Sequence, residues 1–328
     1  MIVDQQRIIV AIPALNEERS IAACLESLGV GQPDLEKVRF VVADGGSTDR
    51  TKEIVAGIAD QNANLQLVDN PAKLQSAGVN KVAEMAEASR DILIRADAHA
   101  TYPAGYVINL ARTLVETQAD SVVVPMDSTG ATCFARAAAW IVDTRLGSGG
   151  SAHRGGAASG WVDHGHHAAM RLQKFREVGG YDARFSHNED AELDHRIVQA
   201  GGRIWLDAGI RLDYQMRRTP GALCRQYWNY GRGRARTVIK HRLRPRMRQL
   251  IPVVNLVLLA VSLLILPFSS LGWVWPLIYA AVLIAASVWM VLGHRSACGL
   301  WAGVALAIMH NAWGAGFLHG LFTQRNVR

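Results

Sequence analysis

Asp97 and His99 stand two residues apart at the end of an apolar run, in the segment IRADAH (residues 94–99). Side chains separated by one residue point the same way in an extended chain, so this carboxylate and this imidazole could share one cation. An isolated pair of this kind is more often a solvated loop pair. The metal interpretation therefore depends on whether other residues converge on the same place.

Polar and acidic residues also follow two other apolar runs. Asn16 and Glu17 come directly after the run 7–15, and Asp44 ends the run 38–44. In a parallel sheet, ligands bind beyond the carboxyl ends of the strands, which meet at one edge. Three strand ends would thus aim polar groups at one edge, which predicts a binding site there.

The elements that must position these residues are visible in the first 213 residues, where strand-like runs alternate with runs of helical spacing. This alternation predicts an α/β fold with a mostly parallel sheet and helices on both faces. The strand-like runs are 7–15, 38–44, 65–69, 91–97 and 121–125, and the helical runs are 17–28, 47–60, 74–88 and the residues after Pro103.

Charge divides the chain into two parts. All 28 acidic residues lie in residues 1–213, together with 21 of the 35 Lys and Arg, so this part has a net charge of −7. The remaining 14 basic residues follow Tyr214 and give that part a net charge of +14. The basic residues gather just ahead of long apolar runs, which favours contact with an anionic membrane surface over nucleic acid.

The apolar runs at residues 250–268, 273–292 and 300–322 are each close to the ~20 residues that span a bilayer core as a helix. The third is the weakest candidate because it contains His310 and Asn311. The N-terminus lacks the pattern of a signal peptide. We therefore expect two or three membrane-spanning helices and an N-terminal domain on the cytoplasmic side.

The cysteines show no paired spacing, which predicts reduced or buried thiols rather than a disulfide framework or a zinc site. They are Cys24, Cys133, Cys224 and Cys298. The glycine-rich stretch 147–160 predicts a flexible loop. We expect the three histidines that follow it to lie in a flexible loop on the acceptor side, with a zinc site as the alternative. These histidines are His164, His166 and His167.

Four segments occur in the order seen in family 2 glycosyltransferases of the GT-A fold: IPALNEERSI, VVADGGSTDRT, IRADAHATYP and GGYDARFSHNEDAELDHRIVQAGG. The resemblance covers about residues 7–215. The basic segment and the apolar C-terminus resemble a branch of membrane-bound enzymes of bacterial exopolysaccharide assembly. The implied organisation is a GT-A domain at 1–215, a basic interfacial segment at 216–249 and a membrane domain at 250–328.

The resemblance implies that Pro13, Asn16 and Glu17 form a loop that contacts the nucleoside of a UDP-sugar, together with Asp44. A carboxylate can accept hydrogen bonds from a uracil imide or a ribose hydroxyl. The segment DGGSTD offers glycines for close backbone approach and a helix start for the diphosphate. The alternative is a capped turn between strand and helix with no ligand.

Asp97 and His99 match the family's two-acid metal motif, with histidine in place of the second acid. A divalent cation there would bridge the donor diphosphate and stabilise the departing UDP. Because magnesium prefers oxygen ligands and manganese accepts nitrogen more readily, the expected cofactor is Mn²⁺ or Mg²⁺, with His99 favouring Mn²⁺.

Asp190 matches the family's general base, which takes the proton of the acceptor hydroxyl. Its neighbour Glu189 is a second candidate for the base and a candidate for contact with the diphosphate or the acceptor. The alternative is that both are acids of a first helical turn, where the helix dipole stabilises them.

Gln226 lies where processive polysaccharide synthases carry a Gln-x-x-Arg-Trp segment, but Asn229 and Tyr230 replace the Arg and Trp. This departure favours addition of a single sugar. Arg232 and Arg234 are candidates for binding a diphosphate of donor or acceptor, with a membrane-surface patch as an equal alternative.

Together, these features predict an inverting glycosyltransferase that adds one hexose, glucose from UDP-glucose, to an undecaprenyl-diphosphate-linked saccharide in exopolysaccharide biosynthesis. The expected location is the bacterial inner membrane, with the bilayer and other exopolysaccharide assembly proteins as partners and no nucleic acid. The alternatives are a processive synthase of the same fold and a non-catalytic, membrane-anchored adaptor that binds a nucleotide sugar.

Overall fold

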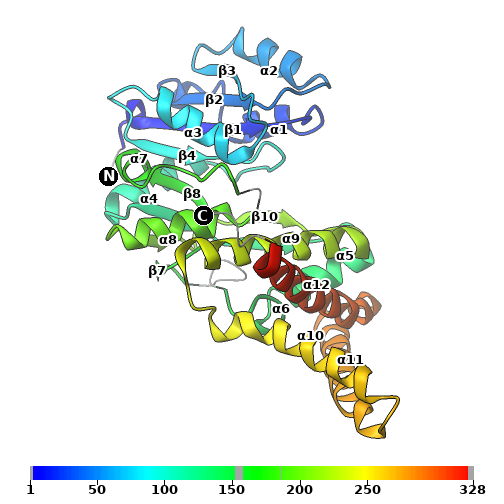
Figure 1. The fold of residues 1–328 in the computed structure, drawn as a ribbon. Coiled ribbons are helices and arrows are strands. Elements are labelled where there is room, and N and C mark those ends of the chain that lie inside the picture. The colour runs from blue at the N-terminus through cyan, green and yellow to red at the C-terminus, as the bar shows by residue number, and fades with distance from the viewer. Residues whose placement is uncertain (1–2, 152–157, 186, 324–328) are drawn as a thin grey trace. The chain divides into compact units, whose positions relative to one another are not determined.

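A computed structural model describes residues 3–151, 158–185 and 187–323 (Figure 1). The chain divides into two compact units. The first consists of Met1–Met126 and Gly156–Asp213, and the second of Asp127–Gly155 and Tyr214–Arg328. The segment Asp127–Gly155, which the sequence analysis places in the N-terminal domain, thus groups with the C-terminal part.

The first unit contains a sheet in which the described residues form eight strands, in the order β3-β2-β1-β4-β8-β5-β9-β7. Strands β3, β2, β1 and β4 run parallel, and β5 is parallel to β9, whereas β8 and β7 are antiparallel to their neighbours. The strands are β1 Ile8–Ala14, β2 Arg39–Asp44, β3 Leu65–Asp69, β4 Ile92–Arg95, β5 Ser121–Val124, β7 Gly160–Val162, β8 His166–Arg171 and β9 Ile204–Leu206.

Both faces of this sheet are buried, which explains why its strands read as continuous apolar runs. Along β1, Ile8, Val10 and Ile12 belong to the core on one face, and Ile9 and Ala11 to the core on the other. The mostly parallel α/β sheet predicted from the sequence is confirmed. The helices of this unit are η1 Gln5–Arg7, α1 Ile21–Ser27, η2 Pro33–Leu35, α2 Thr51–Ala59, α3 Gln75–Met85, α4 Tyr106–Glu116, α7 Leu172–Glu177 and α8 Glu189–Gln199.

Two short strands, β6 Met126–Thr129 and β10 Leu212–Gln215, form a separate two-stranded sheet. Two of the boundaries between the units fall in these strands, after Met126 and after Asp213. The helices of the second unit are α5 Cys133–Val142, α6 Arg145–Ser148, α9 Pro220–His241, α10 Met247–Ile265, η3 Ser270–Trp273, α11 Val274–His294, η4 Ala297–Leu300 and α12 Trp301–Thr323.

Helix α12 is the centre of the second unit and contacts α5, α9, α10 and α11 (Figure 1). Glycines let α9 and α12 approach each other closely. A β-carbon at Gly231 would lie 2.2 Å from the Trp313 carbonyl oxygen, and one at Gly316 would lie 2.2 Å from the Trp228 carbonyl oxygen. Small residues at helix crossings of this kind are common in membrane proteins.

Helices α10 and α11 are long and apolar enough to cross a membrane and lie mostly on the surface of the unit. Leu264 is 73% exposed and Leu292 is 71% exposed. Helix α12, from the third apolar run, is instead largely buried among its neighbours. Only Met247–Ile265 and Ser270–His294 qualify as candidate spans within the part of the chain that the structure describes.

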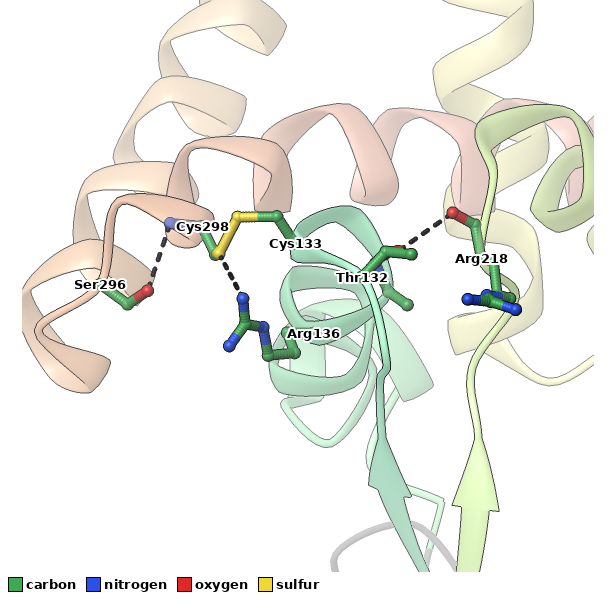
Figure 2. Close-up of a disulfide and its surroundings, with 7 residues drawn as sticks. Thr132, Cys133, Arg136, Arg218, Ser296 and Cys298 are labelled. Atoms are coloured by element: carbon green, nitrogen blue, oxygen red, sulfur yellow. Dashed lines mark hydrogen bonds between the residues drawn. A yellow bond between two sulfur atoms is a disulfide. The ribbon is translucent and has the colours of Figure 1, made fainter.

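A disulfide joins Cys133, at the start of α5, to Cys298 in η4, as Figure 2 shows. The two Cα atoms are 4.9 Å apart, although the residues are separated by 165 positions in the sequence. The prediction that all four cysteines are unpaired thiols is therefore wrong for this pair, because packing of α5 against η4 brings the two together. Cys24 is a buried free thiol, and Cys224 is an exposed one.

Candidate active site

Asp44 ends β2 with its side chain buried. Its Oδ2 accepts hydrogen bonds from the backbone N–H groups of Gly46 (2.8 Å) and Ser47 (3.0 Å), and lies 3.3 Å from Lys52 Nζ. Burial raises the pKa of Asp44, but hydrogen bonds from Ser47, Gly46 and Lys52 outweigh burial and lower it. Its Oδ1 is buried and has no hydrogen-bond partner among the described residues, so it is an acceptor that a ligand donor would satisfy.

The loops after β1 and β2 are fastened to each other by hydrogen bonds. Asn16 N–H donates to Ser47 Oγ (2.9 Å), and Thr48 N–H donates to Asn16 Oδ1 (2.8 Å). Glu17 N–H donates to Thr51 Oγ1 at the start of α2 (2.8 Å). The ends of β1 and β2, two of the three strand ends that were predicted to share one edge, are therefore in direct contact.

Pro13 does not belong to the loop in which the sequence analysis placed it. It lies inside β1 and is buried, opposite Ala43 of β2. Helix α3 packs against this point, since a β-carbon at Gly78 would lie 3.2 Å from the Cβ atoms of Pro13 and Ala43. Pro13 is a packing residue of the sheet at this position.

Asp97 and His99 have different partners in the structure. His99 is 68% exposed in its side chain, and its Nδ1 lies 3.3 Å from Glu17 Oε1. Asp97 follows β4, is 19% exposed, and its Oδ1 accepts from Arg95 Nε (3.4 Å) and from Gln75 Nε2. Burial raises the pKa of Asp97, but Arg95 and the nearby His166 and His99 lower it overall.

Asp190 and Glu189 lie in the first turn of α8. Asp190 Oδ1 accepts from Arg95 Nη1 (2.5 Å) and from the Tyr181 hydroxyl (3.0 Å), and Glu189 Oε1 is 3.8 Å from Arg95 Nη2. Burial and the neighbouring Asp190 raise the pKa of Glu189. One guanidinium therefore connects Asp97, which follows β4, to both acids of α8.

Arg95 was not identified from the sequence, where it reads as the end of an apolar strand. Its side chain is 5% exposed, and its guanidinium carbon lies 5.5 Å from the centre of the Tyr181 ring. Burial lowers the pKa of Arg95, but Asp190, Tyr181 and Asp97 raise it well above the ordinary value. Arg95 therefore carries its positive charge at every physiological pH.

His166 lies near Asp97 and Asp190 at their Oδ2 atoms, whereas Arg95 contacts their Oδ1 atoms. Its Nε2 is 3.9 Å from Asp97 Oδ2, and its Nδ1 is 3.7 Å from Asp190 Oδ2. The neighbouring His164 places its Nδ1 2.6 Å from Oδ2 of the buried Asp194. The expectation that these histidines lie in a loop is wrong for His166 and His167, which are residues of β8. His164 and His166 alternate with Gly165 just ahead of the apolar residues of β8, and this alternation was the sequence signal for a strand.

A divalent cation fits the donor chemistry of this site. Among the described residues, no three His, Cys, Asp or Glu side chains are already arranged around a common point. Asp97 Oδ2 nevertheless lies 3.9 Å from His166 Nε2, and His99 is near enough to help lower the pKa of Asp97. Carboxylate and imidazole ligands suit Mn²⁺, and a diphosphate would supply the remaining oxygens.

The other predicted residues belong to the second unit. Gln226 is buried, and its Nε2 donates to the hydroxyls of Tyr214 (2.5 Å) and Tyr230 (2.9 Å). The Nε atoms of Arg232 and Arg234 are buried without a hydrogen-bond partner in the described part of the chain. Burial, with repulsion from two further arginines, lowers the pKa of Arg234 to about 10.

Residues 9–179 match the family model for glycosyl transferase family 2. The chain is 44% identical over 322 residues to the succinoglycan biosynthesis protein ExoA of Rhizobium meliloti (strain 1021), which covers 97% of this chain and 96% of that protein.

Two solved structures share the fold. Mannosyltransferase PcManGT from Pyrobaculum calidifontis, in complex with GDP-Man and Mn²⁺, superposes with a TM-score of 0.59 and 19% identity, over 94% of this chain and 87% of that one. GalNAc-T7 with UDP, GalNAc and Mn²⁺ gives a TM-score of 0.51 and 14% identity, over 70% and 47% of the two chains. The predicted GT-A fold is thus confirmed.

Proposed function

The chain belongs to glycosyl transferase family 2, and from this we propose that it transfers one hexose from a UDP-sugar, with inversion, to a polyprenyl-diphosphate-linked saccharide. UDP-glucose is the proposed donor. The near full-length relative named for succinoglycan biosynthesis supports a role in exopolysaccharide assembly. Structures of the same fold that contain GDP-Man, or UDP with Mn²⁺, support a nucleotide-sugar donor and a divalent metal.

The donor would lie along the edge formed by the ends of β2, β1 and β4. Asp44 Oδ1 would accept a hydrogen bond from the uracil imide or a ribose hydroxyl, which supplies the partner that this buried atom lacks. Asn16 and Glu17 would border the nucleoside. The diphosphate would lie toward Asp97, near Glu17 and His99.

Asp190 would act as the general base. Its carboxylate takes the proton of the acceptor hydroxyl while the hydroxyl oxygen attacks the anomeric carbon and the bond to the diphosphate breaks. Asp97 and His99, with His166 across from Asp97, would hold Mn²⁺ or Mg²⁺. When bound, this ion supplies positive charge to the departing diphosphate. Attack from the face opposite the leaving group gives inversion.

The second unit would hold the reaction at the membrane. A polyprenyl chain is soluble only in the bilayer, and the apolar, exposed helices α10 and α11 would keep the enzyme next to it. The arginines of α9 and of the segment before α10 would face anionic groups, either the lipid diphosphate or lipid headgroups. We propose an inner-membrane location with the catalytic unit in the cytoplasm.

The observation that carries this proposal is the connection of Asp97 to Asp190, because a transferase must hold its donor diphosphate and its base around one sugar. The test is transfer from a panel of labelled UDP- and GDP-sugars to synthetic polyprenyl-diphosphate saccharides by the purified full-length protein in detergent. We expect one sugar added, from UDP-glucose, and loss of transfer on full chelation of divalent cations.

The length of the product separates the remaining possibilities. Long products would identify a processive synthase, in agreement with the match of Gln226 to the processive segment. Binding of UDP-glucose without any transfer would instead identify a nucleotide-sugar-binding adaptor and overturn the proposed reaction. Activity that survives complete chelation would remove the metal from the mechanism.

A further inference from the structure

We propose that Arg95 positions the general base of the transfer by tying Asp190 to Asp97, so that the base and the donor-binding carboxylate keep a fixed separation. This inference rests on the function proposed above. It assigns a role to a residue that neither the motifs nor the family resemblance identifies.

The contacts are specific to one oxygen of each carboxylate. Arg95 donates through Nη1 to Asp190 Oδ1 (2.5 Å) and through Nε to Asp97 Oδ1 (3.4 Å). His166 lies near the Oδ2 atoms of the same two residues, at 3.7 and 3.9 Å. Contacts on both sides of each carboxylate limit its rotation, so the planes of both groups are set by their neighbours.

Tyr181 reinforces the bond to the base. Arg95 Nη1 donates to the Tyr181 hydroxyl (3.0 Å), and that hydroxyl donates to Asp190 Oδ1 (3.0 Å). The guanidinium therefore reaches Asp190 directly and through a second hydrogen bond. Because a planar guanidinium presents its donors in a fixed fork, it can hold two carboxylates at a defined spacing.

Stability alone is a poor reason for this arrangement. Arg95 is buried, and taking an ion pair out of water carries a desolvation penalty that often cancels its attraction. Asp97, Asp190 and Glu189 also repel one another at this distance, which Arg95 offsets. Three acids gathered around one buried arginine therefore indicate that the reaction requires these side chains at fixed positions.

The two aspartates depend on Arg95 to different degrees. Asp97 keeps the hydrogen bond from Gln75 when Arg95 is removed, so the donor side retains an anchor. Asp190 would lose the shortest of its described contacts and keep the Tyr181 hydroxyl at 3.0 Å and the 3.7 Å approach of His166. Loss of Arg95 should therefore impair the chemical step more than donor binding.

The experiment measures kcat and KM for UDP-glucose with the synthetic acceptor, the affinity for UDP with Mn²⁺ by calorimetry, and thermal unfolding. Arg95→Met, which keeps the bulk without the charge, should lower kcat about 100-fold, the loss expected for a misplaced reacting group, and change UDP affinity less than 3-fold. Arg95→Lys should have a kcat between those of the wild type and Arg95→Met, since one ammonium group cannot replace the fork of guanidinium donors. Tyr181→Phe should lower kcat roughly 5-fold, as for one lost hydrogen bond.

Arg90 provides a matched control, because its side chain is 14% exposed and it donates to the carbonyl oxygens of Gln6, Ile8 and Lys37 away from the site. Arg90→Met should lower the unfolding temperature and leave kcat unchanged. Wild-type kcat in Arg95→Met overturns the inference, as does a loss of UDP affinity equal to the loss of kcat. If Arg95→Met does not fold, wild-type kcat in both Arg95→Lys and Tyr181→Phe overturns it. A wild-type protein that transfers no sugar overturns the proposed function, and this inference with it.

Discussion

At the level of single residues, Asp190→Asn separates the proposed role of Asp190 as general base from its hydrogen bonds to Arg95 and Tyr181. Asp190→Asn keeps an oxygen that can accept from Arg95 and Tyr181, so the first turn of α8 should stay in place. The amide cannot take a proton, so we expect kcat to fall by at least about 100-fold, while UDP affinity stays unchanged. Discontinuous transfer assays measure kcat, and calorimetry measures the affinity for UDP.

Glu189→Gln is the informative comparison for that experiment. Glu189 shares the first turn and the contact with Arg95, but only through a 3.8 Å approach. We expect it to retain most of the activity. If Glu189→Gln loses turnover and Asp190→Asn does not, the base is Glu189.

Asp44 and Asp69 allow a matched test of nucleoside binding, because both pair with Lys52, at 3.3 and 3.6 Å. Asp44 is buried at the proposed site, whereas the Asp69 side chain is 85% exposed. Asp44→Ala should weaken UDP binding about 10-fold, the loss of a charge-assisted hydrogen bond. Asp69→Ala should leave UDP affinity unchanged in the same titration, and equal losses would exclude a specific role for Asp44.

At the level of elements, the crossing of α9 and α12 requires residues without a β-carbon. Gly231→Ala would place a methyl group 2.2 Å from the Trp313 carbonyl oxygen, which forces the helices apart. We expect a loss of about 1–3 kcal/mol in the free energy of unfolding, as for other overpacked sites. Thermal unfolding in detergent measures it.

The control for this variant lies in the same helix. Gly221 has open space where a β-carbon would stand, so Gly221→Ala should be neutral or stabilise by roughly 0.5 kcal/mol. Equal destabilisation by the two variants would show that α9 and α12 do not approach closely at Gly231.

The disulfide fastens α5 to the turn between α11 and α12. Cys133→Ser and Cys298→Ser should each destabilise the oxidised protein by about 2–4 kcal/mol, and the double variant by no more than either one. Reduction should bring the wild type to the level of the variants. Cys224→Ser, which removes an exposed free thiol, should change nothing. Additive losses would contradict the pairing.

The sequence predicts a feature when the residues that determine it are neighbours in the chain. Strands β1 to β5 were predictable, because apolar runs such as Ile8–Ile12 are buried on both faces of the sheet. Motifs at strand and helix ends are the reason that Asp44, Asp97 and Asp190 are predicted as site residues. Sequence gave no sign of Arg95 as a site residue, since its partners on α8 are far away in the chain.

The same reason explains the other errors. Cys133 and Cys298 are 165 positions apart, so no spacing rule connects them. His166 was read as part of a loop because glycines precede it, whereas pairing with β4 and β5 makes its segment a strand. Pro13 was assigned to a loop by resemblance, but its strand continues one residue beyond it.

At the level of the whole molecule, the distribution of charge and apolar surface decides where the protein works. The acids are confined to the first 213 residues, and the chain after Tyr214 has none. Arg244 and Arg246 precede α10, and Arg248 lies in its first turn. The connection between α10 and α11 carries no charge, and Arg295 follows α11. By the positive-inside rule, this pattern predicts that both basic ends lie in the cytoplasm and the uncharged connection outside.

This orientation predicts which thiols a membrane-impermeant maleimide reaches in intact bacterial spheroplasts. Ser270, exposed between α10 and α11, is the site for a new thiol, made as Ser270→Cys in a Cys224→Ser background. That variant should be labelled in intact spheroplasts. The native Cys224, exposed on α9, should be labelled only after the membrane is opened. Labelling of Ser270→Cys only after opening would mean that α10 and α11 do not cross the bilayer, and the catalytic unit would then need another means of reaching a lipid-linked acceptor.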